Sequence, residues 1–395
     1  MSKLLVDGTY AINIVKLKDI AEKKTTKNIH GLVTETFTNS AENGIISQSD
    51  FFDRTITNDK NISGYYIVEP DDFVYNPRIS TFAPVGPINR NKLGRSGVMS
   101  PLYLVFHTHD VEPEYLEWYF KSNAWHQFMR DNGNTGARSD RFSISDAEFF
   151  NMPIPIPPVK VQKAIAKTLT TLDTKVTLEK NEVEKFQNLK SAMLTKMFPK
   201  KGGNVPGIRF DGFTDVWEQR KFEEIAVRSS VMSDKKGLPR VEYEDIISGA
   251  GRLNKDIKLK ESEKVGIVFH KGDVLYGKLR PYLQNWLLAS FNGLAVGDFW
   301  VLQPQNTDSS FLYRLVQSQQ FDEVANQSTG TKMPRADWKL VSKTKFAMPH
   351  SVDEQAAIGA YFEHLDTLIT LHQRKYEKPI DTKKAFLEKL IGGEK

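Results

Sequence analysis

The sequence contains two copies of one long segment that has the periodicity of an amphipathic α-helix. Sliding the chain by 193 positions aligns residues 159–198 with residues 352–391, and 15 of the 40 aligned pairs are identical. A helix of this length extends roughly 60 Å at 1.5 Å per residue. In the first copy, apolar residues recur at steps of 3, 4 or 7 and form one stripe. That stripe needs a long apolar partner, and the second copy is the simplest candidate.

Both copies carry helix boundary signals. A proline run precedes the first and paired glycines follow each, so we expect helices from Pro158 to Phe198 and from Ser351 to Ile391. The second opens on a Ser-Val-Asp-Glu capping box, in which the Ser351 oxygen and the Glu354 carboxylate each bind a free backbone amide. Pro379 lies inside the second helix, where it removes a backbone hydrogen bond, and we expect a bend there.

The two helices are expected to pair antiparallel within the chain through their apolar stripes. The residues predicted at this interface are Ile165, Leu169, Leu172, Val176, Val183, Ile358, Phe362, Leu365, Ile369 and Tyr376.

The rest of the chain forms two strand-rich segments with the same order of landmarks. The Lys16–Ala21 opening returns as Lys221–Ala226, and Asp72–Tyr75 returns within Gly272–Tyr276. We therefore predict an α+β fold with a pseudo-twofold internal duplication. Its four segments are a first globular domain (1–156), a helix and linker (157–206), a second globular domain (207–350) and a second helix (351–395).

Composition excludes several classes of protein. The 395 residues include no cysteine, so disulfides, thiolate metal sites and thiol catalysis are absent. The apolar runs are too short to span a bilayer and the N-terminus lacks the apolar core of a signal peptide, so we expect a cytoplasmic protein without a membrane partner. Residues 157–206 hold 10 Lys+Arg against 4 Asp+Glu, but a lysine-rich helix is usually a solvated face.

Two similar domains carried on one pair of helices suit a ligand that is itself long and pseudo-twofold, such as duplex DNA. Dimeric DNA-binding proteins place their two reading elements about 34 to 36 Å apart, one duplex turn, or at a multiple of it. Because the loops of the two domains differ in sequence, each domain would read a different half-site. The expected target is bipartite and asymmetric.

Base recognition favours Arg and Lys against guanine, and Asn and Gln against adenine. Two loop regions of each domain carry such residues, and the candidates for DNA binding are Asn76, Arg78, Asn89, Arg90, Lys92, Arg95, Arg138 and Arg141 in the first domain and Lys278, Arg280, Tyr282, Lys332 and Arg335 in the second. Any one of them could equally be an ordinary polar loop residue. Their parallel placement in the two halves favours a shared function.

The search for a catalytic site gives negative results. The sequence has no GxxxxGK[ST] phosphate-binding loop, and no Asn-Pro-Pro-aromatic motif that would indicate a methyl-donor site. His107 and His109 form the closest histidine pair, but no third metal ligand lies nearby in the sequence. We therefore expect no catalytic residue, no metal and no cofactor bound by this chain.

Three segments resemble the specificity (S) subunits of type I restriction-modification systems, and the resemblance covers essentially the whole chain. They are Gly207–Phe222, Gly272–Tyr282, and Ile154–Pro158 running into a helix that ends at Lys196-Met-Phe198. The first domain departs from the family pattern because it starts without the Arg-Phe-x-Gly-Phe lead-in.

The resemblance implies a non-catalytic subunit with two target recognition domains, each reading one half of a bipartite site in double-stranded DNA. It implies that the helices set the spacing and dock two methyltransferase (M) subunits, and that up to two restriction (R) subunits join the complex. The chain would be monomeric within that complex. It further implies that the partners methylate adenine N6 with S-adenosylmethionine, use ATP and Mg²⁺, and serve phage defence.

Two other hypotheses remain open at this point. The chain could be a helical scaffold or adaptor whose helices dimerise between chains and whose two domains bind proteins. It could also be a self-contained restriction and methylation enzyme, which the missing motifs disfavour.

Overall fold

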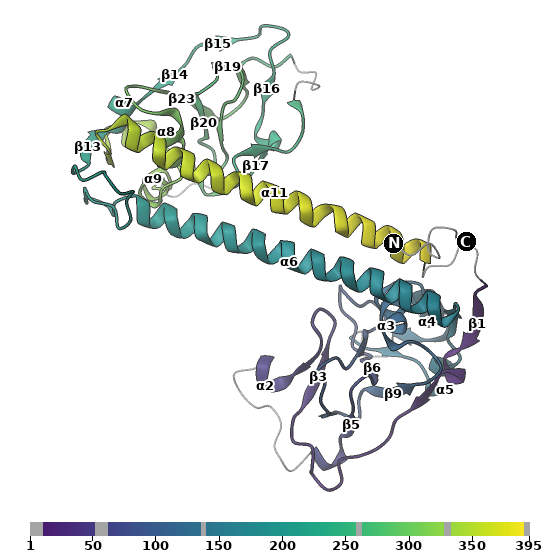
Figure 1. Ribbon diagram of the computed structural model, residues 1–395. Helices are drawn as coiled ribbons and strands as arrows, with labels where there is room; N and C mark the ends of the chain where they lie inside the picture. Colours follow the sequence, from purple (N-terminus) through teal and green to yellow (C-terminus); the bar gives the residue numbers. More distant parts are fainter. Residues whose placement is uncertain (1–10, 52–61, 136–139, 258–262, 328–332, 391–395) are drawn as a thin grey trace. The chain divides into compact units, whose positions relative to one another are not determined.

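The computed structural model describes residues 11–51, 62–135, 140–257, 263–327 and 333–390. The chain divides into two compact units. Unit 1 comprises residues 1–178 and 375–395, and unit 2 comprises residues 179–374. The two long helices are α6 (Val159–Met197) and α11 (Val352–Leu390), as predicted, and each contributes one part to each unit (Figure 1).

Unit 1 is built on a four-stranded antiparallel sheet with four further strand pairs and short helices around it. The sheet has the order β2 (Ala21–Lys23), β9 (Leu104–Thr108), β6 (Phe73–Tyr75), β7 (Ile88–Arg90). The pairs are β1 (Asn13–Lys16) with β12 (Pro153–Ile156), β3 (Phe37–Ser40) with β4 (Gly44–Ser47), β5 (Tyr66–Val68) with β8 (Gly97–Met99), and β10 (Asn134–Thr135) with β11 (Phe142–Ser143). The helices are η1 (Leu17–Asp19), α2 (Gln48–Phe51), η2 (Ile62–Gly64), α3 (Pro113–Lys121), α4 (His126–Asn132) and α5 (Asp146–Phe150).

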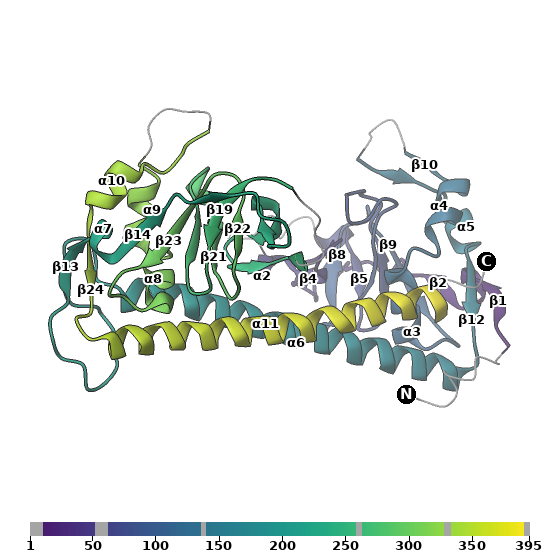
Figure 2. The ribbon, with the colours of Figure 1, turned by 90° about the horizontal axis from the view of Figure 1, so that it is seen from above.

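Unit 2 repeats this plan with a second, mixed sheet (Figure 2). The first sheet has the order β14 (Ala226–Ser229), β23 (Phe299–Pro304), β20 (Val274–Gly277), β21 (Trp286–Leu288), and the second has the order β15 (Met232–Ser233), β19 (Gly266–Phe269), β22 (Gly293–Ala295), β16 (Arg240–Val241). The pairs are β13 (Glu218–Lys221) with β24 (Lys345–Met348), and β17 (Ile246–Ile247) with β18 (Arg252–Leu253). The helices are α7 (Phe222–Ile225), η3 (Tyr243–Asp245), η5 (Pro281–Leu283), α8 (Ser309–Leu315), α9 (Gln319–Ala325) and α10 (Trp338–Lys343).

The strand register makes the predicted duplication concrete. Tyr75 of β6 lies opposite Leu104 of β9, and Tyr276 of β20 lies opposite Trp300 of β23. In both units the strand that opens the domain pairs with the strand that precedes a long helix, β1 with β12 and β13 with β24. Equivalent positions in the two units can therefore be assigned by counting from these pairs.

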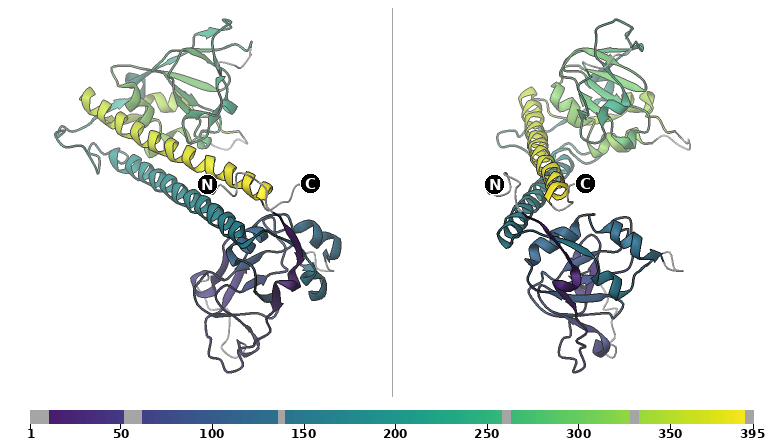
Figure 3. Two further views of the ribbon diagram at one scale, coloured as in Figure 1. Left: turned by 45° about the vertical axis from the view of Figure 1, so that its right-hand side comes forward. Right: turned by 90° about the vertical axis from the view of Figure 1, so that its right-hand side faces the viewer.

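In each unit α6 and α11 lie side by side and run antiparallel (Figure 3). In unit 2, Glu179 of α6 binds His372 of α11 at 2.6 Å, and further along α6 Lys190 binds Asp366, earlier in α11, at 2.6 Å. In unit 1, Lys383 of α11 binds Asp173 of α6. The predicted intrachain pairing of the two helices is therefore confirmed.

The internal duplication is also visible in individual ion pairs. The shift of 193 positions converts Lys190 to Lys383 and Asp173 to Asp366, so the same lysine–aspartate pair forms in each unit with the two helices exchanged. The same shift converts Glu179 to His372, so these two partners are copies of one position.

The stripes predicted for the helix pair also enter the cores of the globular units. Ile165 and Leu169 pack in the core of unit 1 with Phe73 and Phe106, and α11 adds Phe386 there. Ile358, Phe362 and Leu365 are in the core of unit 2, and Val183 is buried as well. The other predicted residues, Leu172, Val176, Ile369 and Tyr376, are half-buried. One stripe thus serves both the partner helix and the adjoining domain.

The start of α11 departs from the sequence prediction. Ser351 Oγ accepts a hydrogen bond from the Glu354 amide at 3.4 Å, as expected of a helix cap. The Glu354 carboxylate, however, accepts from Arg209 at 2.6 and 2.7 Å and from Trp217 Nε1 at 3.2 Å. The glutamate half of the predicted capping box is wrong, because a tertiary cation outcompetes the local backbone amide. Farther along, α11 continues through Pro379 without ending, and the bend expected there stays a prediction.

Neither long helix, nor any other helix among the described residues, has the length and apolarity needed to cross a bilayer. Within the same residues, no three His, Asp or Glu side chains cluster in a way that could hold a metal ion.

Candidate nucleic-acid interface

In unit 1, two loops that are far apart in the sequence meet beside the end of β6. Backbone hydrogen bonds of 2.8 and 3.0 Å join residues 77–79 to residues 140–142. They place Arg78 directly opposite Arg141 in an isolated antiparallel bridge. The early and the late loop cluster predicted for the first domain therefore come together. We call this contact the loop joint of unit 1.

Unit 2 forms the same joint from the equivalent segments. Backbone hydrogen bonds of 2.7 and 2.8 Å join residues 278–280 to residues 334–336, with Leu279 opposite Arg335. Arg141 and Arg335 consequently occupy equivalent positions, and both come from the late loop of their domain. The sequence grouped these residues by analogy, and the backbone pairing gives that grouping a structural basis. We call this contact the loop joint of unit 2.

The two joints differ in what lies beside the shared arginine. Leu104 in β9 and Trp300 in β23 are equivalent, because they lie opposite Tyr75 and Tyr276. Two residues before these positions, unit 1 has Leu102 and unit 2 has Asp298. Leu102 is exposed and lines a cavity of about 300 Å³ together with Arg141. Among the described residues, neither Arg78 nor Arg141 forms an ion pair. The unit 1 arginines are therefore not held by a described carboxylate.

In unit 2, Asp298 binds two predicted DNA-binding residues. Its Oδ2 lies 3.0 Å from Arg335 Nη2, and its Oδ1 lies 3.5 Å from Lys278 Nζ. Tyr243 fixes the surrounding backbone, since its hydroxyl donates to the Asp298 carbonyl at 2.7 Å and accepts from the Leu279 amide at 2.9 Å. Burial is the main cause that raises the pKa of Tyr243, so its hydroxyl stays protonated and can donate.

The turn that follows Lys278 exposes an aromatic side chain. Arg280 and Gln284 flank the short helix η5 with φ angles of 50° and 55°, a left-handed conformation that is uncommon for residues other than glycine. Tyr282 within this turn is 55% exposed. Arg280 Nε is buried without a hydrogen-bond partner among the described residues. The turn thus directs a ring to solvent at the cost of backbone strain.

Several unit 1 candidates are already bound to other parts of the domain. Arg90, with only 11% of its side chain exposed, binds Asp71 at 2.6 Å and Glu117 at 2.8 Å. Lys92 binds Glu117 at 3.1 Å. Burial acts to raise the pKa of Glu117, but Lys121, Arg90 and Lys92 around it hold that pKa at about 2. This cluster ties β7 to α3.

The remaining unit 1 candidates hold loops together. Asn76 donates to the Asn39 carbonyl at 2.9 Å, and Asn89 donates to Asn39 Oδ1 at 2.7 Å, so both anchor the β3–β4 hairpin. Arg95 binds Glu35 at 2.7 Å. Two further candidates, Arg138 and Lys332, lie outside the described residues. Of the described cationic candidates in unit 1, Arg78 and Arg141 are the ones that no described carboxylate binds.

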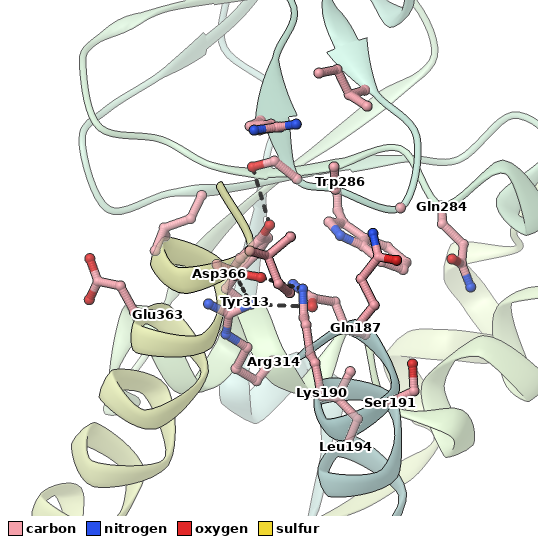
Figure 4. Close-up of a pocket in the computed structure, with 18 of the residues that line it drawn as sticks. Gln187, Lys190, Ser191, Leu194, Gln284, Trp286, Tyr313, Arg314, Glu363 and Asp366 are labelled. Atoms are coloured by element: carbon pink, nitrogen blue, oxygen red, sulfur yellow. Dashed lines mark hydrogen bonds and ion pairs between the residues drawn. The ribbon is translucent and has the colours of Figure 1, made fainter. Parts of the chain in front are cut away.

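A cleft of about 820 Å³ lies in unit 2 between the β17–β18 hairpin, α8 and the two long helices (Figure 4). Lys190 and Arg314 reach Asp366 from either side, at 2.6 and 2.8 Å. Burial lowers the pKa of Lys190 and Asp366 opposes that shift. Five lining residues carry buried polar atoms without a partner among the described residues: Arg252 Nε, Trp286 Nε1, Arg314 Nε, Gln317 Nε2 and Gln373 Oε1.

In this cleft the globular part of unit 2 contacts the two long helices. Its central carboxylate, Asp366, binds both cations, and the five unpaired polar atoms are buried. Unit 1 has a counterpart cleft of about 390 Å³ beside the β3–β4 hairpin and α3, where Lys383 lies 4.8 Å from the ring centre of Trp118. A glutamine attaches each helix to its domain in the same way: the Glu112 amide donates to Gln162 and the Asp308 amide donates to Gln355, each at 2.9 Å.

Sequence reasoning missed Asp298, Tyr243 and Glu117. Each acts on a residue more than 20 positions away, and no local pattern marks such a contact. The repeat itself did contain one usable signal. Lysine and aspartate are identical in both copies at the positions of Lys190 and Asp366, which predicts a reciprocal ion pair in an antiparallel duplication.

Comparison with known proteins gives a consistent result. Residues 11–187 match the family model described as the type I restriction modification DNA specificity domain. The chain is 23% identical over 274 residues to the type I restriction enzyme MjaVIII specificity subunit of Methanocaldococcus jannaschii, a match that covers 62% of each protein. It is 22% identical over 286 residues to the type I restriction enzyme EcoDI specificity subunit of Escherichia coli, covering 65% of this chain and 63% of that protein.

The chain thus matches somewhat less than two thirds of the length of these curated relatives. Its fold is similar to the crystal structure of the type I restriction-modification system S subunit from M. genitalium, with a TM-score of 0.63 over 98% of both chains. The two sequences are only 12% identical, so this similarity concerns the fold.

Proposed function

We propose that this chain, whose residues 11–187 match the family model described as the type I restriction modification DNA specificity domain, is the non-catalytic subunit that recognises the DNA target for such a complex. Each unit would read one half of a bipartite, asymmetric site. The observation that carries this proposal is the loop joint, which both units build on the same backbone hydrogen bonds but equip with different side chains. Equivalent backbones with unlike side chains suit two different half-sites.

The chemistry of the joints fits base recognition. A guanidinium can donate two parallel hydrogen bonds to guanine O6 and N7, and each such pair contributes about 1–3 kcal/mol of discrimination against the wrong base. Arg141 and Arg335 are the equivalent candidates for this role. Lys278 and Arg78 beside them can bind phosphates, which contributes affinity that is independent of sequence and falls with salt.

The partners in this proposal follow from the family. The long helices would set the distance between the half-sites and dock two methyltransferase subunits, with restriction subunits joining where the system has them. S-adenosylmethionine, ATP and Mg²⁺ would be bound by those partners, which would methylate adenine N6 in the cytoplasm. This chain would be present as a monomer in the complex.

Sequencing of methylated bases in the host tests the proposal directly. Cells that contain the chain should show adenine methylation at one motif made of two short half-sites with a fixed spacing. Deleting the chain's gene, with the methyltransferase gene intact, should abolish methylation at that motif. Absence of any bipartite methylated motif that depends on this chain would overturn the proposal.

Single substitutions then assign the half-sites. Arg335→Ala should relax base preference in one half-site only, and Arg141→Ala should do so in the other, each by roughly 5- to 150-fold, which corresponds to about 1–3 kcal/mol. Lys343→Ala is the matched control, since Lys343 is an exposed unit 2 cation paired with Glu223 outside the joint. Equal loss of affinity for all sequences would instead make the arginine a phosphate contact.

A further inference from the structure

Asp298 places a carboxylate between two cations that DNA would use. Its Oδ2 lies 3.0 Å from Nη2 and 3.3 Å from Nε of Arg335, and its Oδ1 lies 3.5 Å from Lys278 Nζ. The two cations come from the two segments of the unit 2 loop joint. An oxyanion held by a guanidinium and an ammonium is also the arrangement in which proteins bind a DNA phosphate.

The ion pairs of Asp298 are accessible and weak enough to exchange. The side chain of Arg335 is 54% exposed, that of Lys278 31% and that of Asp298 29%. Exposed pairs of this kind contribute little to stability. A phosphate that approached Lys278 and Arg335 would therefore have to displace Asp298 or remain beside its negative charge.

A guanine differs from a phosphate in this setting. Asp298 binds the edge of the Arg335 guanidinium formed by Nε and Nη2. The guanidinium has five N–H donors, so the edge formed by Nη1 and Nη2 keeps donors for the two acceptors of a guanine. A guanine is uncharged and is not repelled by the carboxylate. Asp298 thus leaves base recognition open and opposes phosphate binding.

We propose that Asp298 is a specificity-determining residue of unit 2: it orients Arg335 towards a base edge and lowers the affinity of Lys278 and Arg335 for DNA of arbitrary sequence. This inference rests on the proposed function and concerns the same interface. Among the described residues of unit 1, Leu102 occupies the equivalent position beside Arg141, so that position supplies no carboxylate. The restraint that Asp298 places on non-specific binding is therefore expected in unit 2 and not at the equivalent position of unit 1.

The test measures binding of the full chain, alone and with its methyltransferase partner, to two duplexes. One has a random sequence, and the other contains the target motif in unmethylated form. Fluorescence anisotropy over a range of salt concentrations gives the affinity and its salt dependence. Asp298→Asn should bind the random duplex roughly three- to tenfold more tightly. The slope of log K against log salt should steepen by about one to two, as expected for one or two additional phosphate contacts.

Affinity for the specific duplex should rise less than affinity for the random duplex, or fall, so that the ratio of the two decreases. Glu223→Gln is the matched control. It removes one carboxylate charge from an exposed pair with Lys343 in the same unit, outside the joint. It should leave both affinities and the salt slope within about twofold of wild type. A purely structural effect of Asp298→Asn would appear as a lower melting temperature of the variant in thermal unfolding.

A reciprocal exchange sharpens the test. Asp298→Leu gives unit 2 the side chain of unit 1 and should behave like Asp298→Asn. Leu102→Asp places a carboxylate beside Arg141 and should weaken random-duplex binding with a shallower salt slope. Leu102 is 62% exposed, so this change does not disturb the core.

The outcomes distinguish a failure of the proposed function from a failure of the role proposed for Asp298. If the wild-type chain binds no duplex, alone or with its partner, the proposed function fails. If wild type binds but Asp298→Asn leaves affinity and salt slope unchanged, the role of Asp298 is overturned and the proposed function stands. Equal strengthening of specific and random binding would also overturn it, because Asp298 would then be a general repulsive charge.

Discussion

The two units share one backbone plan and differ in where they place charge. At the start of the long helix, unit 1 has Val161 buried in its core, whereas unit 2 has Glu354 bound to Arg209. Helices α3 and α8 are equivalent, and where α3 of unit 1 has the buried, cation-bound Glu117, α8 of unit 2 has Tyr313. Duplication therefore preserved the hydrogen-bonded frame while each copy acquired its own buried carboxylate. Three comparisons test how far each unit depends on its own charged contacts.

The largest expected effect comes from Arg209→Ala in unit 2. Glu354 is 1% exposed, and removing its cation leaves a buried carboxylate whose remaining side-chain donor among the described residues is Trp217. Breaking a buried pair in this way costs about 3–5 kcal/mol. Urea unfolding followed by hydrogen exchange of the β13 and β24 amides measures the loss in unit 2.

The matched control is Arg209→Met combined with Glu354→Val, which gives unit 2 the valine that unit 1 has at this position. This double variant should recover at least half of the lost free energy, because no unpaired charge remains. A loss below about 1 kcal/mol for Arg209→Ala would show that the pair is not needed.

The next effect is a pH dependence confined to unit 1. The pKa of Glu117 is held at about 2, below its ordinary value of 4.5. A lowered pKa in the folded state stabilises the fold above about pH 4.5, and this contribution is lost as the pH falls from there towards 2. The shift corresponds to on the order of 3 kcal/mol.

Glu117→Gln should remove this part of the acid sensitivity. Unfolding free energies of wild type and variant, measured at pH 6 and pH 3 with hydrogen exchange of α3 amides, give the comparison. The difference between the two proteins should be largest at pH 6 and should fall to roughly two fifths of that value at pH 3. Tyr313, the unit 2 counterpart, does not ionise in this range because burial raises its pKa. A constant difference across the range would contradict the assignment.

The smallest expected effect compares the two copies of the helix ion pair. Asp366 holds both Lys190 and Arg314, whose side chains are 13% and 4% exposed. Asp173 binds Lys383 and is itself 40% exposed. Asp366→Asn should cost roughly 2–3 kcal/mol, since it leaves two poorly solvated cations. Asp173→Asn should cost about 1 kcal/mol or less. Equal losses in denaturant unfolding would show that the copies are energetically equivalent.

The sequence alone was sufficient for features that repeat or that are periodic. The helix pair followed from a 193-residue shift, and its antiparallel direction is confirmed by the pairs at Lys190 and Lys383. The grouping of early and late loops also followed from the repeat, although their DNA contacts stay a prediction. These inferences succeeded because helix periodicity and internal similarity are properties of the chain itself.

The contacts of single charged residues could not be predicted from the sequence in the same way. The capping box at Ser351 satisfied a local pattern, yet Arg209, 145 positions earlier, took the Glu354 carboxylate. Asp298 and Leu102 occupy equivalent backbone positions and differ only in their side chains. The contacts of Asp298 depend on cations from two segments that are distant in the sequence. A local sequence pattern shows which contacts a side chain can form, and the tertiary structure determines which of those contacts it does form.

The meeting of Glu179 with His372 has a consequence for how such a protein can arise. If the two halves were separate, identical chains forming a symmetric dimer, a position that faces its own copy would present the same side chain twice, either two acids or two imidazoles. Fusion into one gene removes that obligation, because the two copies can mutate independently. In this chain an acid faces an imidazole at 2.6 Å, and the two fused copies are free to differ wherever a symmetric dimer would have to repeat itself.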